Sequence, residues 1–272
     1  MTKILFLFCC IILLFYCIIA ICAPILAPYD PYAILDSPLQ HPDSVHPLGT
    51  NATGQDILSQ LIYGTRITLL IGFLAAIISC CISTTLGIQT GYYGGFFDEL
   101  VMRVIDIFMT IPLFPLLLVL TLFFTPGIYT TAALMGIVGS THSIRVVRSQ
   151  VMMIHNATYI EGARSIGAKD HQIMVWHILP NILPLVSVKL VSSMQHYLLM
   201  GVGLSFLGLG DPMVIDWGQM IEQAYSSGGF ALGLWWWLLP PGLAVVGISL
   251  SLALLGYISE EQFNHRLKVN RL

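Results

Sequence analysis

Charged residues are scarce in this sequence. Lys, Arg, Asp and Glu together make up 9% of the 272 residues, whereas about a quarter of a typical soluble domain is charged. The chain therefore has too little polar material to cover the surface of a soluble enzyme or to keep a disordered protein in solution. A nucleic-acid binder is excluded as well, because 11 basic and 14 acidic residues give a formal net charge of −3 and leave no basic face.

Motifs for catalysis and for metal binding are also missing. The six cysteines lie in apolar runs without a C-x-x-C pair, and we interpret them as small buried hydrophobic residues. The sequence contains no G-x-x-x-x-G-K-[ST], no G-x-S-x-G and no H-E-x-x-H, the patterns that hold phosphates, an acyl nucleophile or zinc. We therefore predict no enzyme, no resident metal and no cofactor in this chain, so that any energy source must come from a partner.

Long apolar runs dominate what is present. Hydrophobic residues account for 56% of the chain and the mean hydropathy is +0.83. A helix needs about 20 apolar residues to cross the hydrocarbon core of a bilayer. The sequence predicts an all-α polytopic membrane protein, in contact with membrane lipid, with six transmembrane helices: Ile4–Ala27, Ile67–Gln89, Leu100–Phe124, Tyr129–Val151, Leu183–Phe206 and Leu234–Ile258.

The basic residues predict the orientation, because Lys and Arg are retained on the cytoplasmic side. With both termini in the cytoplasm, ten of the eleven fall on cytoplasmic segments or adjoining helix ends. The exception, Arg66, lies at the outer start of the second span. The segments assigned to the outside, 29–60, 125–128 and 207–233, contain no Lys or Arg. We expect Trp235, Trp236 and Trp237 to form an interfacial belt on that side.

The outer loop 28–60 is rich in Pro, Asp, His and Ser. Its prolines prevent long helices, so we expect an ordered or extended flap. His41, Asp43 and His46 form an H-x-D-x-x-H pattern that has two interpretations. The three side chains could pass on a transition metal, or they could belong to a solvated loop.

The inner loop 152–181 is the longest cytoplasmic segment. Glu161–Ile166 is compatible with a short helix that ends at Gly167, a residue able to adopt positive φ. Asp170 is then expected to cap a second helix. Its expected apolar face consists of Ile173, Trp176, His177 and Pro180. A helix, a glycine corner and an amphipathic helix would suit docking into a partner's groove.

This loop resembles the EAA loop of permease subunits in binding-protein-dependent ABC importers. The matching residues are Glu161, Ala163, Gly167, Leu179 and Pro180. Gly162 replaces the middle Ala of the trio, and His177 replaces the usual Ile. In that family the loop forms a coupling helix that inserts into the ATPase subunit. The resemblance implies that Glu161, Gly162, Ala163, Gly167, Asp170, His177, Leu179 and Pro180 form an ATPase-coupling loop here.

The resemblance to dipeptide, oligopeptide and nickel permeases extends along the chain. It is carried by Leu48–Ser59, Ile62–Arg66, Gly91–Gly95, Asp98–Glu99, Met102–Asp106, Ile111–Pro112, Ser205–Gly210 and Trp217–Gly218. It implies the type I ABC importer permease fold in three parts. Residues 1–62 would be an N-terminal transmembrane helix with the outer loop. Residues 63–258 would be the permease core, with the coupling loop at about 155–181, and 259–272 a cytoplasmic tail.

The same resemblance implies function and partners. The chain would form a path for di- or oligopeptides, with nickel or a metal chelate as the alternative substrate. Its partners would be a homologous sister permease, two ATP-binding subunits that hold ATP and Mg²⁺, and an extracytoplasmic substrate-binding protein, in a bacterial or archaeal cell (inner) membrane. A hypothesis from another class is a membrane sensor that docks a soluble protein without transport.

Polar residues within the spans are candidates for a gate or pathway, because charge inside a membrane is costly. Glu99, Arg103 and Asp106 follow the i, i+4, i+7 spacing of one helix face and could form an ion-paired stripe. Gln195 and His196 could line a polar path or bond a neighbouring helix. Lys189 is expected to extend its amine toward the inner surface.

Overall fold

The computed structural model describes the backbone of residues 2–269 and the side chains of residues 4–261. Every regular element within these residues is helical, apart from an isolated bridge between Thr50 and Asp56. The elements are α1 (Thr2–Leu26), α2 (Ile57–Tyr93), α3 (Gly95–Thr110), α4 (Leu113–Thr121), α5 (Ile128–His155), α6 (Thr158–Ser165), α7 (Asp170–Gln172), the π-helix η1 (Ile173–Ile178), α8 (Leu179–Phe206), α9 (Trp217–Ser226) and α10 (Trp235–Val269).

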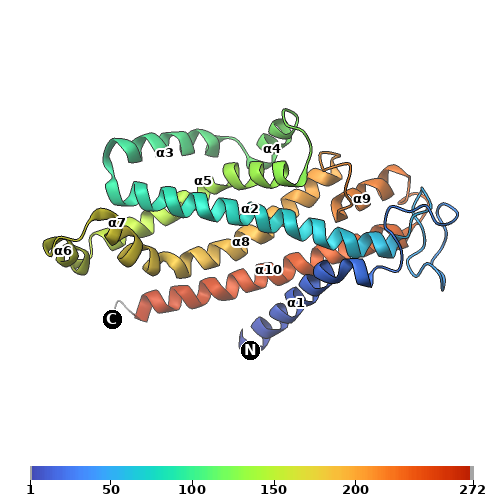
Figure 1. Cartoon of the computed structure of the whole chain (residues 1–272), viewed down its shortest axis with the longest axis horizontal. Helices are drawn as coiled ribbons and strands as arrows, with labels where there is room; N and C mark the ends of the chain where they lie inside the picture. The colour runs from blue at the N-terminus through green and yellow to red at the C-terminus, as the bar shows by residue number, and fades with distance from the viewer. Residues whose placement is uncertain (1, 270–272) are drawn as a thin grey trace.

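The long helices lie along one axis and separate two ends of the molecule (Figure 1). At one end, called here the α6 end, α2 and α5 finish and α6, α7 and η1 connect α5 to α8. At the opposite end, called the α9 end, the loop between α1 and α2 lies with α9 and the start of α10. The segments predicted to lie inside and outside the cell are therefore at opposite ends of the bundle.

Four helices within the described chain are long and apolar enough to cross a membrane: Ile4–Leu26, Ile57–Tyr93, Asp170–Phe206 and Trp235–Glu261. The protein is thus a multi-pass membrane protein. The prediction of one continuous third helix over Leu100–Phe124 was wrong. Pro112 lacks an N–H and separates α3 from α4, and the two helices are bent by 89°. Counting this pair as one broken span gives five.

The predicted fourth span is present as α5, which is not among the helices that pass the hydropathy criterion. Its polar composition fits its position, because α5 packs along α2 over most of its length (Figure 1). Small residues allow this close approach. A Cβ at Gly136 of α5 would lie 2.7 Å from Cβ of Ile78, and a Cβ at Gly87 of α2 would lie 2.7 Å from Cβ of Val147.

The second predicted helix begins ten residues earlier than expected. Asp56 caps α2, because its side chain accepts a hydrogen bond from the N–H of Ser59. The added turns pack against α9, where the indole N–H of Trp217 donates to the Leu61 carbonyl at 3.1 Å. This end of α2 is thereby fixed to the outer segments.

The tryptophan cluster differs from the expected interfacial belt. Trp235 is exposed, but Trp236 and Trp237 are buried in the apolar core between α2, α8, α9 and α10. The helix α1 lies at the side of the bundle against α2 and α10, and nearly all of its apolar residues are at least partly exposed. The helix α10 continues through residues 259–269, and residues 270–272 of the predicted tail lie outside the described chain.

Candidate functional site at the α6 end

The connection between α5 and α8 forms a sharp corner at Gly167. The helix α6 ends at Ser165, and Gly167 has φ +88°, a conformation that side chains with a Cβ rarely adopt. The N–H of Gly167 donates to the carbonyl of Arg164, and the N–H of Ala168 donates to the carbonyl of Ala163 at 3.1 Å. The helix and glycine corner predicted from sequence are therefore both present.

The inner side of this connection is an apolar core. Ile160 of α6 is buried together with residues from η1, α8 and the ends of α2 and α5, and Ala163 of α6 is buried as well. The partners are Ile88, Tyr92, Val147, Val151, Ile173, Ile178 and Ile182. Because six of these side chains are fully covered or nearly so, the connection is held against the bundle and moves with it rather than as a free loop.

Polar contacts fix the same connection to α2. The hydroxyl of Tyr92 donates to the carboxylate of Asp170 at 2.6 Å. The guanidinium of Arg164 lies 5.3 Å from the centre of the Tyr92 ring, within the range of a cation–π contact. Arg164 also donates to the ring of His155 at the end of α5. Tyr92 therefore joins both sides of the corner to the core.

The outer side of the corner is open to solvent. Glu161, Gly162 and Gly167 are exposed, and 87% of the Ile166 side chain is accessible. A Cβ built at Gly162 or Gly167 would meet no atom within 4 Å. We call the segment Glu161–Gly167 the elbow. An exposed apolar side chain on a rigidly held segment is an arrangement that fits a complementary groove on another protein.

The segment after the corner differs from the prediction in two respects. Asp170 does not cap the second helix, since Lys169 occupies the N-cap position and Asp170 bonds Tyr92 instead. The expected single apolar face is also absent. Residues 173–178 form a π-helix, which rotates successive side chains differently from an α-helix, so Ile173 is buried while 75% of Trp176 is exposed.

The remaining residues of the predicted coupling loop connect η1 to α8. His177 is half-buried, and its carbonyl accepts a hydrogen bond from the side-chain amide of Asn181 at 2.6 Å. Leu179 packs partly against the apolar core described above, and Pro180 is exposed in the first turn of α8. Because α8 continues η1 in one helix over Asp170–Phe206, the missing N–H of Pro180 removes a helical hydrogen bond at this junction.

The charge stripe predicted on α3 forms only in part. Arg103 lies 4.0 Å from Glu99, with both side chains largely exposed, while Asp106 pairs with Arg145 of α5. Asp98, which the sequence analysis missed, binds Arg148 of α5 through two hydrogen bonds of 2.5 Å. The i, i+4 rule considers contacts within one helix, whereas Asp98 and Asp106 pair with arginines of α5.

Of the two predicted pathway residues on α8, one lines a cavity. His196 borders a cavity of about 450 Å³ between the α3–α4 bend, α5 and α8, together with Lys189. Gln195 lies outside this lining and is half-buried. Lys189 is half-buried in the cavity wall. Three later residues of α8 line the same cavity: Ser192, Ser193 and His196.

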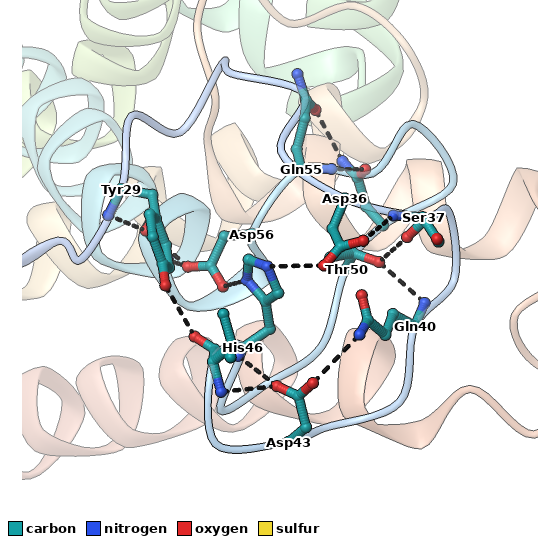
Figure 2. A network of polar contacts seen from close by, with 12 residues as sticks. Tyr29, Asp36, Ser37, Gln40, Asp43, His46, Thr50, Gln55 and Asp56 are labelled. Atoms are coloured by element: carbon teal, nitrogen blue, oxygen red, sulfur yellow. Dashed lines mark hydrogen bonds and ion pairs between the residues drawn. The ribbon is translucent and has the colours of Figure 1, made fainter.

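The loop at the α9 end is ordered by a polar network (Figure 2). The ring of His46, only 2% exposed, lies 2.9 Å from Asp56 and 4.0 Å from Asp36. Since Asp56 also caps α2, this pair ties the loop to the start of α2. The interpretation of His46 as part of a solvated loop was therefore wrong, and that of an ordered flap is confirmed.

His41, Asp43 and His46 do not converge on one point. His41 packs on Trp236 with ring centres 4.3 Å apart, and Asp43 accepts from the backbone N–H groups of Val45 and His46. The hydrogen bond from the His46 N–H holds the pKa of Asp43 below its ordinary value. Within the described chain no three His, Cys, Asp or Glu side chains are grouped to bind a metal ion.

Together, the membrane-crossing helices, the broken third span and the exposed corner at Gly167 define a multi-pass membrane protein. Comparison with known sequences identifies the class. The pattern of the family described as "binding-protein-dependent transport system inner membrane component" matches residues 83–269. The chain belongs to this family and is the membrane-embedded, non-enzymatic permease component of an ABC importer.

Curated relatives cover most of the chain. The dipeptide transport system permease protein of Haemophilus influenzae is 32% identical over 266 residues, which span 95% of this chain and 89% of the relative. The probable D,D-dipeptide transport system permease protein of Escherichia coli is 30% identical, over 90% of this chain and 82% of its own. The glutathione transport system permease protein of Pectobacterium atrosepticum is 33% identical, over 92% of this chain and 83% of its own.

Proposed function

We propose that this chain forms one half of the translocation path of a peptide importer, and that the elbow at Glu161–Gly167 receives the force of ATP hydrolysis from partner subunits. The observation that carries this proposal is the combination of an exposed Ile166 with a buried inner side of the same elbow. Such an element presents a contact surface and transmits displacement to α2, α5 and α8. Relatives named as dipeptide and glutathione permeases support peptides as the substrate class.

The proposed assembly contains a homologous sister permease, two ATP-binding subunits and a substrate-binding protein outside the cell. The α6 end faces the cytoplasm, with both termini on that side of the cell (inner) membrane. The absence of Lys and Arg from 29–60 and 207–233 supports this orientation. ATP and Mg²⁺ are held by the ATP-binding subunits, and this chain contributes no cofactor site.

In this proposal the elbow acts as a lever between two states of the bundle. Closure of the ATP-binding subunits pushes the surface at Ile166, and the buried core under α6 carries the push into the ends of α2 and α5. The cytoplasmic side of the path closes while the α9 end opens to the substrate-binding protein. Each partner favours the state with which it makes more contacts.

Co-purification with the ATP-binding subunits tests the docking role. We expect Ile166→Asp to remove this association without unfolding the permease, because the exposed side chain supports no packing in the described chain. Phe230→Asp is the matched control, since 84% of Phe230 is exposed in the α9 end, and it should retain the ATP-binding subunits. Gly167→Pro should abolish uptake while membrane insertion persists, because proline cannot adopt φ +88°. Uptake that survives Gly167→Pro would refute the coupling role.

The substrate class is tested with the co-purified substrate-binding protein. Titration with di- and oligopeptides, with free Ni²⁺ and with a nickel chelate compares the two substrates that the sequence left open. We expect saturable peptide binding and ATP-dependent peptide uptake into proteoliposomes that contain the whole importer. Binding of nickel alone, with no peptide uptake, would overturn the proposal for peptides.

A further inference from the structure

The cavity beside the broken third span is lined by basic side chains without acidic ones. Lys189, His142 and His196 line it, and its walls contain no Asp or Glu. None of these three side chains forms an ion pair with another side chain among residues 4–261. A half-buried lysine without an ion-pair partner is costly in a membrane-spanning helix, so this cavity is suited to an anionic group brought by a ligand.

The cavity lies at the middle of the bundle. Its lining comes from residues 138–143 and 189–197, which fall in the middle third of α5 and of α8. Substrate sites of transporters commonly occur near the bilayer midplane, where broken helices meet. The third wall of this cavity is such a break, formed by Ile111, Pro112 and Leu113.

The break adds to the positive character of the cavity. The nine-residue helix α4 begins at Leu113 in the cavity wall and has no side-chain N-cap hydrogen bond. The first N–H groups of a helix have no partner within it, and they carry a partial positive charge. Lys189 and the start of α4 therefore border the same space from two different elements.

The rest of the wall combines hydroxyl groups with apolar side chains, and the size of the cavity limits the ligand. The hydroxyls belong to Thr141, Ser143, Ser192, Ser193 and Tyr197. Phe108, Met109, Leu113 and Val138 contribute hydrophobic surface. The volume of about 450 Å³ lies in the range of about 300–1,000 Å³ that is typical of small-molecule sites. The lining thus fits a small molecule that carries both a carboxylate and an apolar group.

We propose that this cavity is a binding site in the translocation path, called here the carboxylate station. Lys189 binds the C-terminal carboxylate of a short peptide there, and His142 and His196 are further hydrogen-bonding partners. This inference rests on the proposed function as a peptide permease and assigns the residue that recognises the substrate's charge. Lys189 is a binding residue here, instead of a side chain that only extends its amine to the inner surface.

The test uses the intact importer in proteoliposomes and compares three variants. Lys189→Met removes the charge at similar size, Lys189→Arg keeps it, and Ser187→Ala alters α8 outside the cavity lining. We expect Lys189→Met to lower uptake of a dipeptide with a free carboxylate by about tenfold or more, the loss expected for one charge-assisted hydrogen bond. Lys189→Arg, which keeps the charge, should retain more uptake than Lys189→Met, and Ser187→Ala should stay near the wild-type rate.

A binding measurement without the substrate-binding protein isolates the permease. A dipeptide of alanine and the diazirine amino acid photoleucine is cross-linked to the purified complex, and excess alanyl-leucine or its C-terminal amide competes. The free acid should compete better than the amide in the wild type, and this difference should vanish in Lys189→Met. Equal competition by acid and amide in the wild type would overturn the inference.

The outcomes separate the two proposals. If the wild-type importer takes up no peptide, the proposed function itself fails. If it takes up peptide and Lys189→Met does so at the same rate, only the carboxylate station fails. Loss of the sister permease from purified Lys189→Met would also overturn the station, since Lys189 would then act in subunit assembly.

Discussion

The hydroxyl of Tyr92, one residue before the end of α2, donates a hydrogen bond of 2.6 Å to Asp170, the residue with which α7 begins. This bond joins the end of α2 to the segment that directly follows the corner at Gly167. Its two partners are 78 residues apart in sequence, and the longest helix of the protein carries one of them. Movement of the elbow is therefore coupled directly to α2.

Removal of that hydroxyl should loosen the elbow. We expect Tyr92→Phe to keep the ring in its apolar core and to cost about 1 kcal/mol of local stability. Hydrogen exchange of residues 158–172 should accelerate, and peptide uptake should fall while the ATP-binding subunits remain attached. Tyr93→Phe is the control, since the neighbouring ring is 56% exposed. Equal effects of the two substitutions would contradict a specific role for the Tyr92 bond.

Close packing between α2 and α5 makes a second prediction. Gly136→Ala places a Cβ 2.7 Å from Ile78 and 2.8 Å from the Ala75 carbonyl, so the helices must separate. We expect a loss of about 1–3 kcal/mol, as in other overpacked cores, measured as a lower unfolding temperature in detergent. Gly242→Ala in α10, where the added Cβ meets nothing within 4 Å, should cause no loss. An unchanged unfolding temperature for Gly136→Ala would contradict this prediction, because it would mean that α2 and α5 accommodate the added Cβ without a loss of stability.

The Asp98–Arg148 pair should hold α3 against α5. Both side chains are mostly buried and share two hydrogen bonds. Asp98→Ala should therefore cost about 1–3 kcal/mol. Glu99→Ala is the matched control, because Glu99 is 70% exposed and lies 4.0 Å from Arg103, and exposed pairs contribute about 0–1 kcal/mol. Thermal unfolding of the two variants gives the comparison, and a larger loss for Glu99→Ala would refute the assignment.

The loop at the α9 end should lose protection in acid. The folded pKa of Asp43 lies below the ordinary value of 3.8, chiefly because its carboxylate accepts from the His46 N–H. Its contribution is fully present above that ordinary pKa and is lost as the pH falls through the lower folded value. After correction for the intrinsic pH dependence of amide exchange, the protection of residues 41–50 should thus be steady from pH 7 to pH 5 and fall below about pH 4. Asp43→Asn should lack this acid-dependent part, and an identical pH profile in the variant would exclude Asp43 as its source.

The sequence predicted the class of fold because apolar runs and basic residues follow from the membrane alone. Within the candidate site, the corner at Gly167 was predictable since a glycine after a short helix is a local signal. Three features needed the tertiary structure. The break at Pro112 lies inside an apolar run, the π-helix at 173–178 has no distinct sequence signature, and the pairing of Asp98 with Arg148 joins residues 50 positions apart.

The tryptophans show the same limit. A run of three aromatic residues beside the outer boundary is typical of an interfacial belt, and Trp235 is exposed as such a belt requires. Trp236 is covered by His41, which comes from a loop almost 200 residues earlier. Composition near a boundary indicates depth in the membrane, but it does not indicate which side chains another segment covers.

The π-helix between the elbow and α8 has a consequence for insertions and deletions. A π-turn contains one residue more than the α-helical turn it replaces, and each residue of an α-helix rotates the next by about 100°. The extra residue sets the angular phase between Trp176 on the elbow side and the inward face of α8. Deleting a single residue from 173–178 would restore regular winding and turn the two surfaces out of alignment, although every side chain that faces the partner would still be present.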